Sequence, residues 1–188
     1  MRLALRRTLG VTFAILLAVT ASADSGRGKR FEITDDCDPN DPAWAPTGGC
    51  LTNGEVTNAE FGAALPQGHP SWRIEPPYVE DRRLDDIRVR NTGGRVHTFT
   101  EVAQFGNGYV PPLNAARVVP PGATFTAPEC VAPTGGPSAL AQATTLAPGQ
   151  ELRVENLDPG THNFMCCIHP WMRTVVKIDE RGRRHDDH

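Results

Sequence analysis

The sequence has few long apolar runs and no excess of positive charge. Its only long apolar run lies at the N-terminus, which excludes a membrane protein with several spans. The formal net charge of the 188 residues is −3, so nucleic-acid binding through a basic surface is not expected. No internal repeat is visible along the chain. One globular domain with short extensions is the simplest organisation for a chain of this length.

Turn-forming residues, in contrast, are abundant, with 18 Gly and 17 Pro. This content argues against a helical bundle or a coiled coil, because both residues interrupt long helices. It favours many short strands joined by turns, and the chain is long enough for such strands to bury a hydrophobic core.

The N-terminal segment, residues 1–23, has the features of a secretory signal peptide. Arginines precede an apolar run over residues 9–19, and small residues follow up to Ala23, where we expect cleavage. The apolar run is too short to span a bilayer, so no stable span is expected in the mature protein. The pair Arg6-Arg7 leaves Sec and twin-arginine export both open. The mature protein is therefore expected in the periplasm or outside the cell.

The chain contains five cysteines, and export makes disulfides possible. Cys37 and Cys50 flank a loop rich in Pro and Gly, and we expect them to form a disulfide that closes it. Cys166 and Cys167 are adjacent, so a bond between them would be strained. Cys130 and Cys167 are then either bonded to each other or both free. At least one cysteine remains for another role.

Residues 24–69 form a polar leader with no long alternation of apolar residues. The pattern from Thr57 to Glu60 predicts a capping box that opens a short helix over residues 61–65. Glu60 also stands where the last ligand of a calcium-binding loop would lie, which is the alternative interpretation. We expect a disulfide-closed cover or docking surface that is dispensable for metal chemistry, with its acids clustered at Asp35, Asp36, Asp38 and Asp41.

Residues 70–179 carry the pattern of an all-β domain, and the polar residues 180–188 are expected to form a disordered tail. Residues 103–147 are rich in Gly, Pro and Ala and are expected to form long loops with one or two strands. Short strands at regular spacing predict an antiparallel β-sandwich. The expected strands are residues 71–75, 78–80, 86–91, 95–102, 151–155, 161–166 and 173–178.

One segment, GTHNFMCCIHPWMRTVV, contains a set of soft metal ligands. Cys166, His169 and Met172 follow one another at intervals of three residues. A thiolate, an imidazole and a thioether together favour copper, whereas zinc prefers Cys and His and seldom uses Met. A trigonal copper site needs a second imidazole from a strand adjacent in space. His97, which follows the turn after DIRVRN, meets this requirement.

The ligand segment resembles the C-terminal ligand loop of the cupredoxins, the plastocyanin and azurin family of type 1 blue copper proteins. The Cys-x-x-His-Pro-x-Met spacing is most similar to the short loop of amicyanin. NTGGRVHTFTE resembles the first-histidine segment of that family, and PSWRIEPPYVE resembles its opening strand. The similarity covers residues 70–179.

This resemblance implies a Greek-key β-sandwich that binds one copper ion per chain, preceded by an N-terminal extension. It makes His97, Cys166 and His169 the equatorial ligands and Met172 the weak axial ligand. The neighbouring thiol of Cys167 leaves a choice of register. Strand alternation and the family spacing both favour Cys166. The 68 residues between His97 and Cys166 imply inserted loops.

The function expected from this ligand set is one-electron transfer with a redox partner protein. Electrons would pass through an exposed edge of His169, framed by Pro170 and Trp171. Copper oxidases and nitrite reductases need further copper sites, usually built from His-x-His pairs, and no two of the six histidines are spaced in that way. A copper-binding or copper-delivery protein without an electron-carrier role is the main alternative. An accessory copper domain of an oxidoreductase system is a further one.

Overall fold

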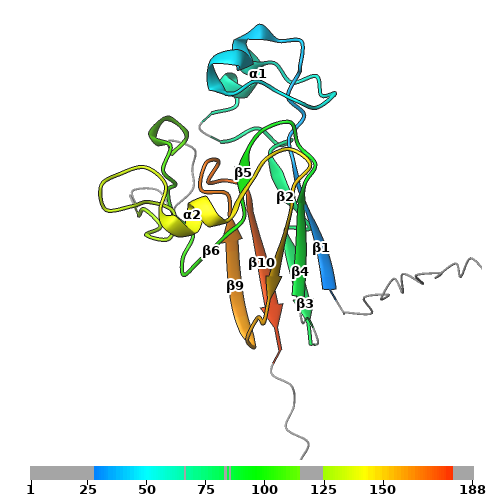
Figure 1. Ribbon diagram of the computed structural model, residues 1–188, viewed down its shortest axis with the longest axis vertical. Coiled ribbons are helices and arrows are strands. Elements are labelled where there is room, and N and C mark those ends of the chain that lie inside the picture. Colours follow the sequence, from blue (N-terminus) through cyan, green and yellow to red (C-terminus); the bar gives the residue numbers. More distant parts are fainter. Residues whose placement is uncertain (1–27, 66, 83, 85, 115–124, 180–188) are drawn as a thin grey trace, which may run out of the picture.

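In the computed structural model, the chain forms a β-sandwich with a small helical cap at one end (Figure 1). The structure describes residues 28–65, 67–82, 84, 86–114 and 125–179. The expected signal peptide and the expected disordered tail lie outside this part of the chain. Within it, no helix is long and apolar enough to cross a membrane.

The first sheet has four strands in the order β2-β1-β4-β8. Its bounds are Arg73–Glu75 for β2, Gly28–Thr34 for β1, Asp86–Asn91 for β4 and Glu151–Glu155 for β8. β1 pairs parallel with β4 and antiparallel with β2, while β8 closes the other edge antiparallel to β4. Burial alternates along the end of β1, where Phe31 and Ile33 face the core.

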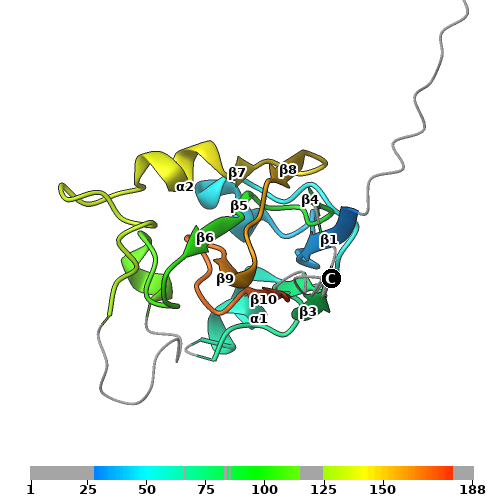
Figure 2. The same cartoon turned by 90° about the horizontal axis from the view of Figure 1, so that it is seen from below.

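The second sheet has the order β3-β10-β9-β6. It comprises β3 (Tyr78–Asp81), β10 (Arg173–Ile178), β9 (Gly160–Met165) and β6 (Thr100–Val102). A separate two-stranded ladder joins β5 (His97–Thr98) to β7 (Thr145–Leu146). The two sheets are seen nearly end-on in Figure 2.

The expected β-sandwich is confirmed, but not all of its neighbouring strands are antiparallel. β1 runs parallel to β4, and β3 runs parallel to β10. Alternation within a strand specifies which residues face the core but not the direction of the neighbouring strand, so the sequence could not distinguish these pairings. The strands expected at residues 86–91, 151–155 and 173–178 have the same bounds in the structure.

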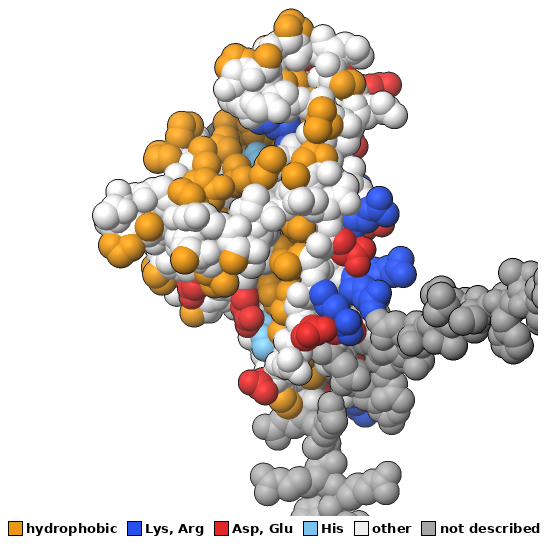
Figure 3. All heavy atoms as spheres, viewed as in Figure 1, with side chains coloured by type: hydrophobic (Ala, Val, Ile, Leu, Met, Phe, Trp, Pro, Cys, Tyr) orange, Lys and Arg blue, Asp and Glu red, His pale blue; other side chains and the backbone are white. Residues whose placement is uncertain are grey.

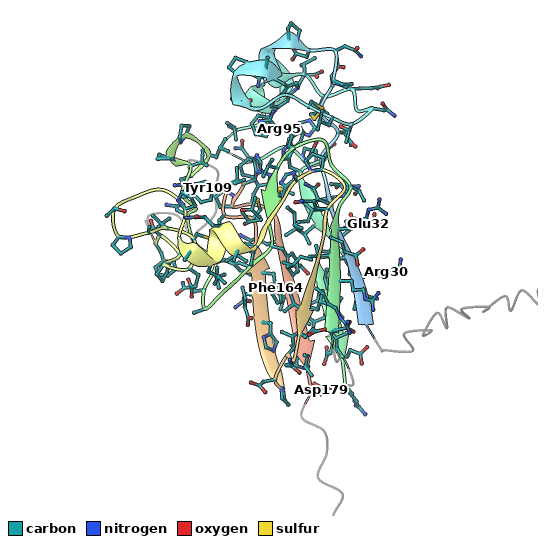
Figure 4. All side chains as sticks on the ribbon, viewed as in Figure 1. Arg30, Glu32, Arg95, Tyr109, Phe164 and Asp179 are labelled. Carbon is teal, nitrogen blue, oxygen red and sulfur yellow. A yellow bond between two sulfur atoms is a disulfide. The ribbon has the colours of Figure 1, made fainter. Side chains whose placement is uncertain are left out.

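Aromatic and branched side chains fill the space between the two sheets. The rings of Phe99 and Phe164 stack with centroids 4.5 Å apart, and Phe31 packs against Phe99 at 5.9 Å. Phe164 is labelled in Figure 4, on β9. Ile87 and Val89 of β4 are fully buried in the same cluster. This core fixes the strand ends from which the site residues project.

The leader is part of the sandwich, which corrects the expectation that strands begin near residue 70. β1 belongs to the leader and lies between β2 and β4 in the first sheet. A boundary between residues 69 and 70 would therefore remove a central strand. The sequence of β1, GKRFEIT, shows only two buried apolar positions, and its main partner β4 lies far along the chain.

The rest of the leader folds over one end of the sandwich (Figure 1). It contains η1 (Pro42–Thr47) and α1 (Asn58–Ala63), and the expected disulfide joins Cys37 to Cys50. The capping box at Thr57 is confirmed, although the helix begins earlier than the expected residues 61–65. Glu60 accepts hydrogen bonds from the backbone and side chain of Thr57, so its carboxylate is used as a helix cap.

Residues 103–147 are here called the insertion, and their described parts, 103–114 and 125–147, lie on the side of the sandwich. They include η2 (Pro111–Leu113), α2 (Ala139–Ala143) and the strand β7. A disulfide joins Cys130 to Cys167, which resolves the pairing that the sequence left open. A small separate core surrounds this disulfide, with members Val102, Ala127, Cys130, Ala141, Met165 and Cys167.

Candidate metal centre

Three of the four predicted ligands meet in a buried cluster at the end of the sandwich beneath the leader. Among the described residues, His97, Cys166 and His169 form a group whose candidate ligand atoms all lie within 4.8 Å of one another. The Sγ atom of Cys166 lies 3.7 Å from Nδ1 of His97 and 3.7 Å from Nδ1 of His169. Met172, the fourth predicted ligand, is 1% exposed and follows in the same loop.

Backbone hydrogen bonds give the loop of residues 166–172, here called the ligand loop, its shape. The Cys166 N–H donates to the Met172 carbonyl at 3.0 Å, and the Met172 N–H donates to the His169 carbonyl at 2.9 Å. The sulfur of Cys166 accepts the N–H of Thr98 at 3.4 Å and that of His169 at 3.5 Å. The loop is thus closed on itself, and the sulfur is fixed by N–H groups from two segments.

The spacing of these donor atoms fits a single bound ion. A soft ion with a metal–sulfur bond of about 2.3 Å and a metal–nitrogen bond of about 2.0 Å separates sulfur from nitrogen by about 3.5 Å at tetrahedral angles, and by slightly more at wider angles. Both sulfur–nitrogen distances here are 3.7 Å. The site can therefore accept a metal without movement of the backbone.

A carboxylate of the leader, Asp35, holds the second nitrogen of His97. Oδ2 of Asp35 lies 2.8 Å from Nε2 of His97, and both side chains are fully buried. Asp35 also accepts the backbone N–H groups of Gly94 at 2.9 Å and Arg95 at 3.1 Å. These bonds direct Nδ1 of His97 toward Cys166, as outer carboxylates commonly do for metal-binding histidines.

The charges in the cluster are coupled. Burial lowers the pKa of His97, but hydrogen bonds and charge interactions with Asp35 and Cys166 outweigh burial and raise the pKa to about 9. Burial raises the pKa of Cys166, but hydrogen bonds with His169 and His97 hold it well below its ordinary value. Burial lowers the pKa of His169. The metal-free cluster thus favours a thiolate, which is the form that binds metals.

The structure distinguishes the two adjacent cysteines. Cys167 is bonded to Cys130, whereas Cys166 is a free, buried cysteine. The N–H of Cys167 donates to Oγ1 of Thr98 at 2.8 Å, which holds the strand end in this register. Cys166 is therefore the thiol that faces the two histidines.

The expectation of an exposed edge on His169 is wrong. His169 is 4% exposed, and Pro170 is also buried. The ring of Phe61 from the leader meets the His169 ring edge-on at 6.1 Å, and Trp171 meets it at 5.5 Å. Because the leader covers the histidine, Trp171 serves here as a packing residue rather than as the frame of an open port.

Sequence reasoning did not find Asp35 as a site residue. Asp35 stands in the acidic cluster noted in the leader, next to Asp36, which is exposed. Nothing in the sequence ranks these acids by burial. The only available signal was that Asp35 stands two residues after Ile33 and so continues the alternation of the apolar residues Phe31 and Ile33 at the end of a strand.

Comparisons with known proteins gave matches among solved structures alone, since no family model and no curated protein matches the chain. A purple cupredoxin from Nitrosopumilus maritimus is 14% identical and has a TM-score of 0.37, with 80% of this chain and 99% of that chain covered. A reduced amicyanin mutant is 17% identical with a TM-score of 0.31, and the match covers 56% of this chain and 71% of that chain. The copper nitrite reductase of Thermus scotoductus is 16% identical with a TM-score of 0.31, and the match covers 77% of this chain and 28% of that chain.

The neighbours of this chain among solved structures thus include cupredoxins, the family that the ligand loop resembles. Because the identities and TM-scores are low, we draw the function from the chain's own site.

Proposed function

We propose that the chain binds one copper ion in a type 1 site and acts as a one-electron carrier. The observation that supports this most strongly is the buried Cys166 sulfur with one imidazole nitrogen at 3.7 Å on each side. His97, Cys166 and His169 would be the equatorial ligands, and Met172 the axial ligand. Copper, when bound, supplies a one-electron couple between Cu(II) and Cu(I).

The donor set favours copper over zinc. Thiolate, imidazole and thioether are the ligands of blue-copper sites, whereas structural zinc sites use Cys and His. Met172 is buried in the same loop as Cys166 and His169, and its backbone is hydrogen-bonded at both its N–H and its carbonyl. These bonds hold the backbone of Met172 in place, and its thioether would supply the weak axial interaction.

The surroundings of the ligands suit electron transfer rather than substrate chemistry. Asp35 accepts the Nε2 proton of His97, which leaves Nδ1 for the metal. Two backbone N–H groups hold the sulfur, so its position does not depend on the metal's charge. Since all four ligands are buried protein groups, both oxidation states would be held with little rearrangement.

An electron carrier also needs a partner and a location. We propose a redox partner protein, not yet identified, and export to the periplasm or outside the cell after cleavage near Ala23. N-terminal sequencing of protein secreted by an expressing bacterium would test the cleavage. A mature chain that still starts at Met1 would contradict it.

The test of the function is copper loading of the full mature chain. We expect one copper per chain by metal analysis, an intense visible band in the oxidised form, and a reversible one-electron wave in voltammetry. His169→Ala should lose the band, while His162→Gln, a change outside the cluster, should keep it. One bound copper without the band or the wave would instead support the copper-delivery alternative.

A further inference from the structure

A hollow of ≈ 570 Å³ lies between the leader and the sandwich, beside the candidate metal centre. Trp44 and Phe61 line it from the leader, and Val110 and Leu113 line it from the insertion. Hydrophobic side chains gather beneath the leader on this side of the molecule (Figure 3). The size falls within the range of about 300–1,000 Å³ that is typical of sites for small molecules.

The inner part of the hollow reaches the metal centre. Ile168 and His169 of the ligand loop are among its lining residues. His169 is only 4% exposed, so a bulky protein surface cannot approach it closely.

One positive charge, Arg95, lies on the wall of this apolar space. Its guanidinium lies over the Trp44 ring, 4.7 Å from the ring centre. It donates hydrogen bonds to the carbonyls of Thr47 and Gly49. In the described part of the chain, no carboxylate forms an ion pair with the Arg95 side chain. Figure 4 places Arg95 at the junction of the leader and the strands.

Two acids of the leader, Asp35 and Asp41, are hydrogen-bonded to groups other than the Arg95 guanidinium. Asp35 is bonded to His97 and to the backbone N–H of Arg95. Asp41 accepts the N–H groups of Ala43 and Asn58, where it caps η1. Asp35 has a charge interaction with Arg95, but among the described residues no carboxylate is ion-paired with its half-buried guanidinium. The charge of Arg95 therefore favours an anionic group on any ligand that enters.

We propose that this hollow, here called the leader cleft, binds a small aromatic molecule that carries one anionic group. The rings would lie among Trp44, Phe61 and Leu113, and the anion would pair with Arg95. This binding site belongs to the apoprotein as well as to the metal-bound protein. It is therefore independent of the proposed electron-carrier function, although a bound molecule would lie next to His169.

The test is a fluorescence titration of the metal-free mature protein with 8-anilinonaphthalene-1-sulfonate, an aromatic sulfonate. We expect saturable binding of one probe per chain. Ala147→Trp places an indole in the leader cleft, because Ala147 is a lining residue, and should abolish binding. Leu140→Trp on α2 is the matched control, since Leu140 is 44% exposed and lies outside the cleft. It should bind as the unmodified protein does.

A second pair of measurements tests the charge. Arg95→Gln should weaken binding of the sulfonate probe about fivefold, the equivalent of about 1 kcal/mol for a partly exposed ion pair. The neutral probe N-phenyl-1-naphthylamine should bind this variant and the unmodified protein equally. Near-UV circular dichroism and melting temperature would establish that each variant is folded, and Val110→Trp replaces Ala147→Trp if the latter is not.

The proposal is overturned if the sulfonate probe does not saturate at one site, or if a folded cleft-filling variant binds as well as the Leu140→Trp control. Equal loss of both probes in a folded Arg95→Gln variant would overturn the anionic part. None of these results depends on copper, so failure here is distinguishable from failure of the proposed function.

Discussion

The leader and the insertion both extend beyond the two sheets, and each takes part in one disulfide. Cys37–Cys50 lies within the leader, whereas Cys130 of the insertion is bonded to Cys167 of the ligand loop. The two segments differ in how they are attached. The leader supplies the central strand β1 and the buried Asp35 that holds His97. The described parts of the insertion, residues 103–114 and 125–147, add no strand to either four-stranded sheet. They end in β7, which pairs with β5, and they are tied to the ligand loop by Cys130–Cys167. The leader thus supplies a central strand of a sheet, whereas the insertion supplies only the short partner of β5.

The largest difference is expected from deletion. A chain that begins at His69 loses β1, including the fully buried Phe31 and Ile33, and should not fold. Its far-UV circular dichroism should show an unfolded chain, and it should not bind copper. This reverses the expectation, drawn from the sequence, that the leader is dispensable.

The matched deletion lies in the insertion. Replacing residues 133–136, the turn before Pro137, by Gly-Gly should leave the fold and copper binding unchanged, because all four residues are exposed. A folded, copper-binding chain that begins at His69 would refute the idea that the leader belongs to the domain.

Removal of each disulfide compares the bond within the leader with the bond between the insertion and the ligand loop. In the chain-entropy relation, the separations of 13 residues for Cys37–Cys50 and 37 for Cys130–Cys167 correspond to about 3 and about 4 kcal/mol. Urea unfolding of the two double Cys→Ser variants would measure these losses. A much larger loss for the leader pair than for the insertion pair would show that the effect is not one of loop closure.

The link between the leader and the metal centre is tested by Asp35→Asn. This change keeps the shape but removes the charge from the hydrogen bond to His97. We expect a loss of about 1.5–3 kcal/mol in the free energy of unfolding and about 10–100-fold weaker metal binding. Asp36→Asn, at the exposed neighbour, is the control and should change neither. Equal effects of the two substitutions would remove Asp35 from the site.

The smallest effect is expected at His162, on β9, outside both additions. Burial lowers its pKa, but hydrogen bonds to the Asp158 carbonyl and Glu101 outweigh burial and raise the pKa above the ordinary 6.5. A histidine whose pKa is raised on folding stabilises the folded protein fully at pH values below the pKa of the unfolded chain. This contribution is lost as the pH rises through the pKa of the folded state. Unfolding measured from pH 5 to pH 8 should therefore show a smaller decline in His162→Gln. An unchanged pH profile would rule out this contribution.

The ligands were predictable from the sequence because chemistry and local spacing define them. Cys166, His169 and Met172 lie within seven residues of one another, and His97 follows a recognisable turn. Strands such as β4 and β10 were predictable for a similar reason, since their alternation is regular. The structure brings His97, Cys166 and His169 together as expected.

The remaining features depend on contacts between distant segments. The pairing of β1 with β4 joins segments more than fifty residues apart, and β1 has only a short alternation of its own. The burial of Asp35 and the cover over His169 follow from how the leader docks. No local pattern encodes that docking, so the sequence placed the electron port where the structure places a buried ring.

The most direct test of the copper site is the visible spectrum of two copper-loaded variants. Cys166→Ser should lose the intense band of the oxidised protein, because that band requires the thiolate as a copper ligand. The double variant Cys130→Ser/Cys167→Ser should keep it, because Cys167 is bonded to Cys130, whereas the free cysteine Cys166 lies beside both histidines. A band that survives in Cys166→Ser, or that disappears only in the double variant, would contradict the assignment of Cys166 as the copper ligand.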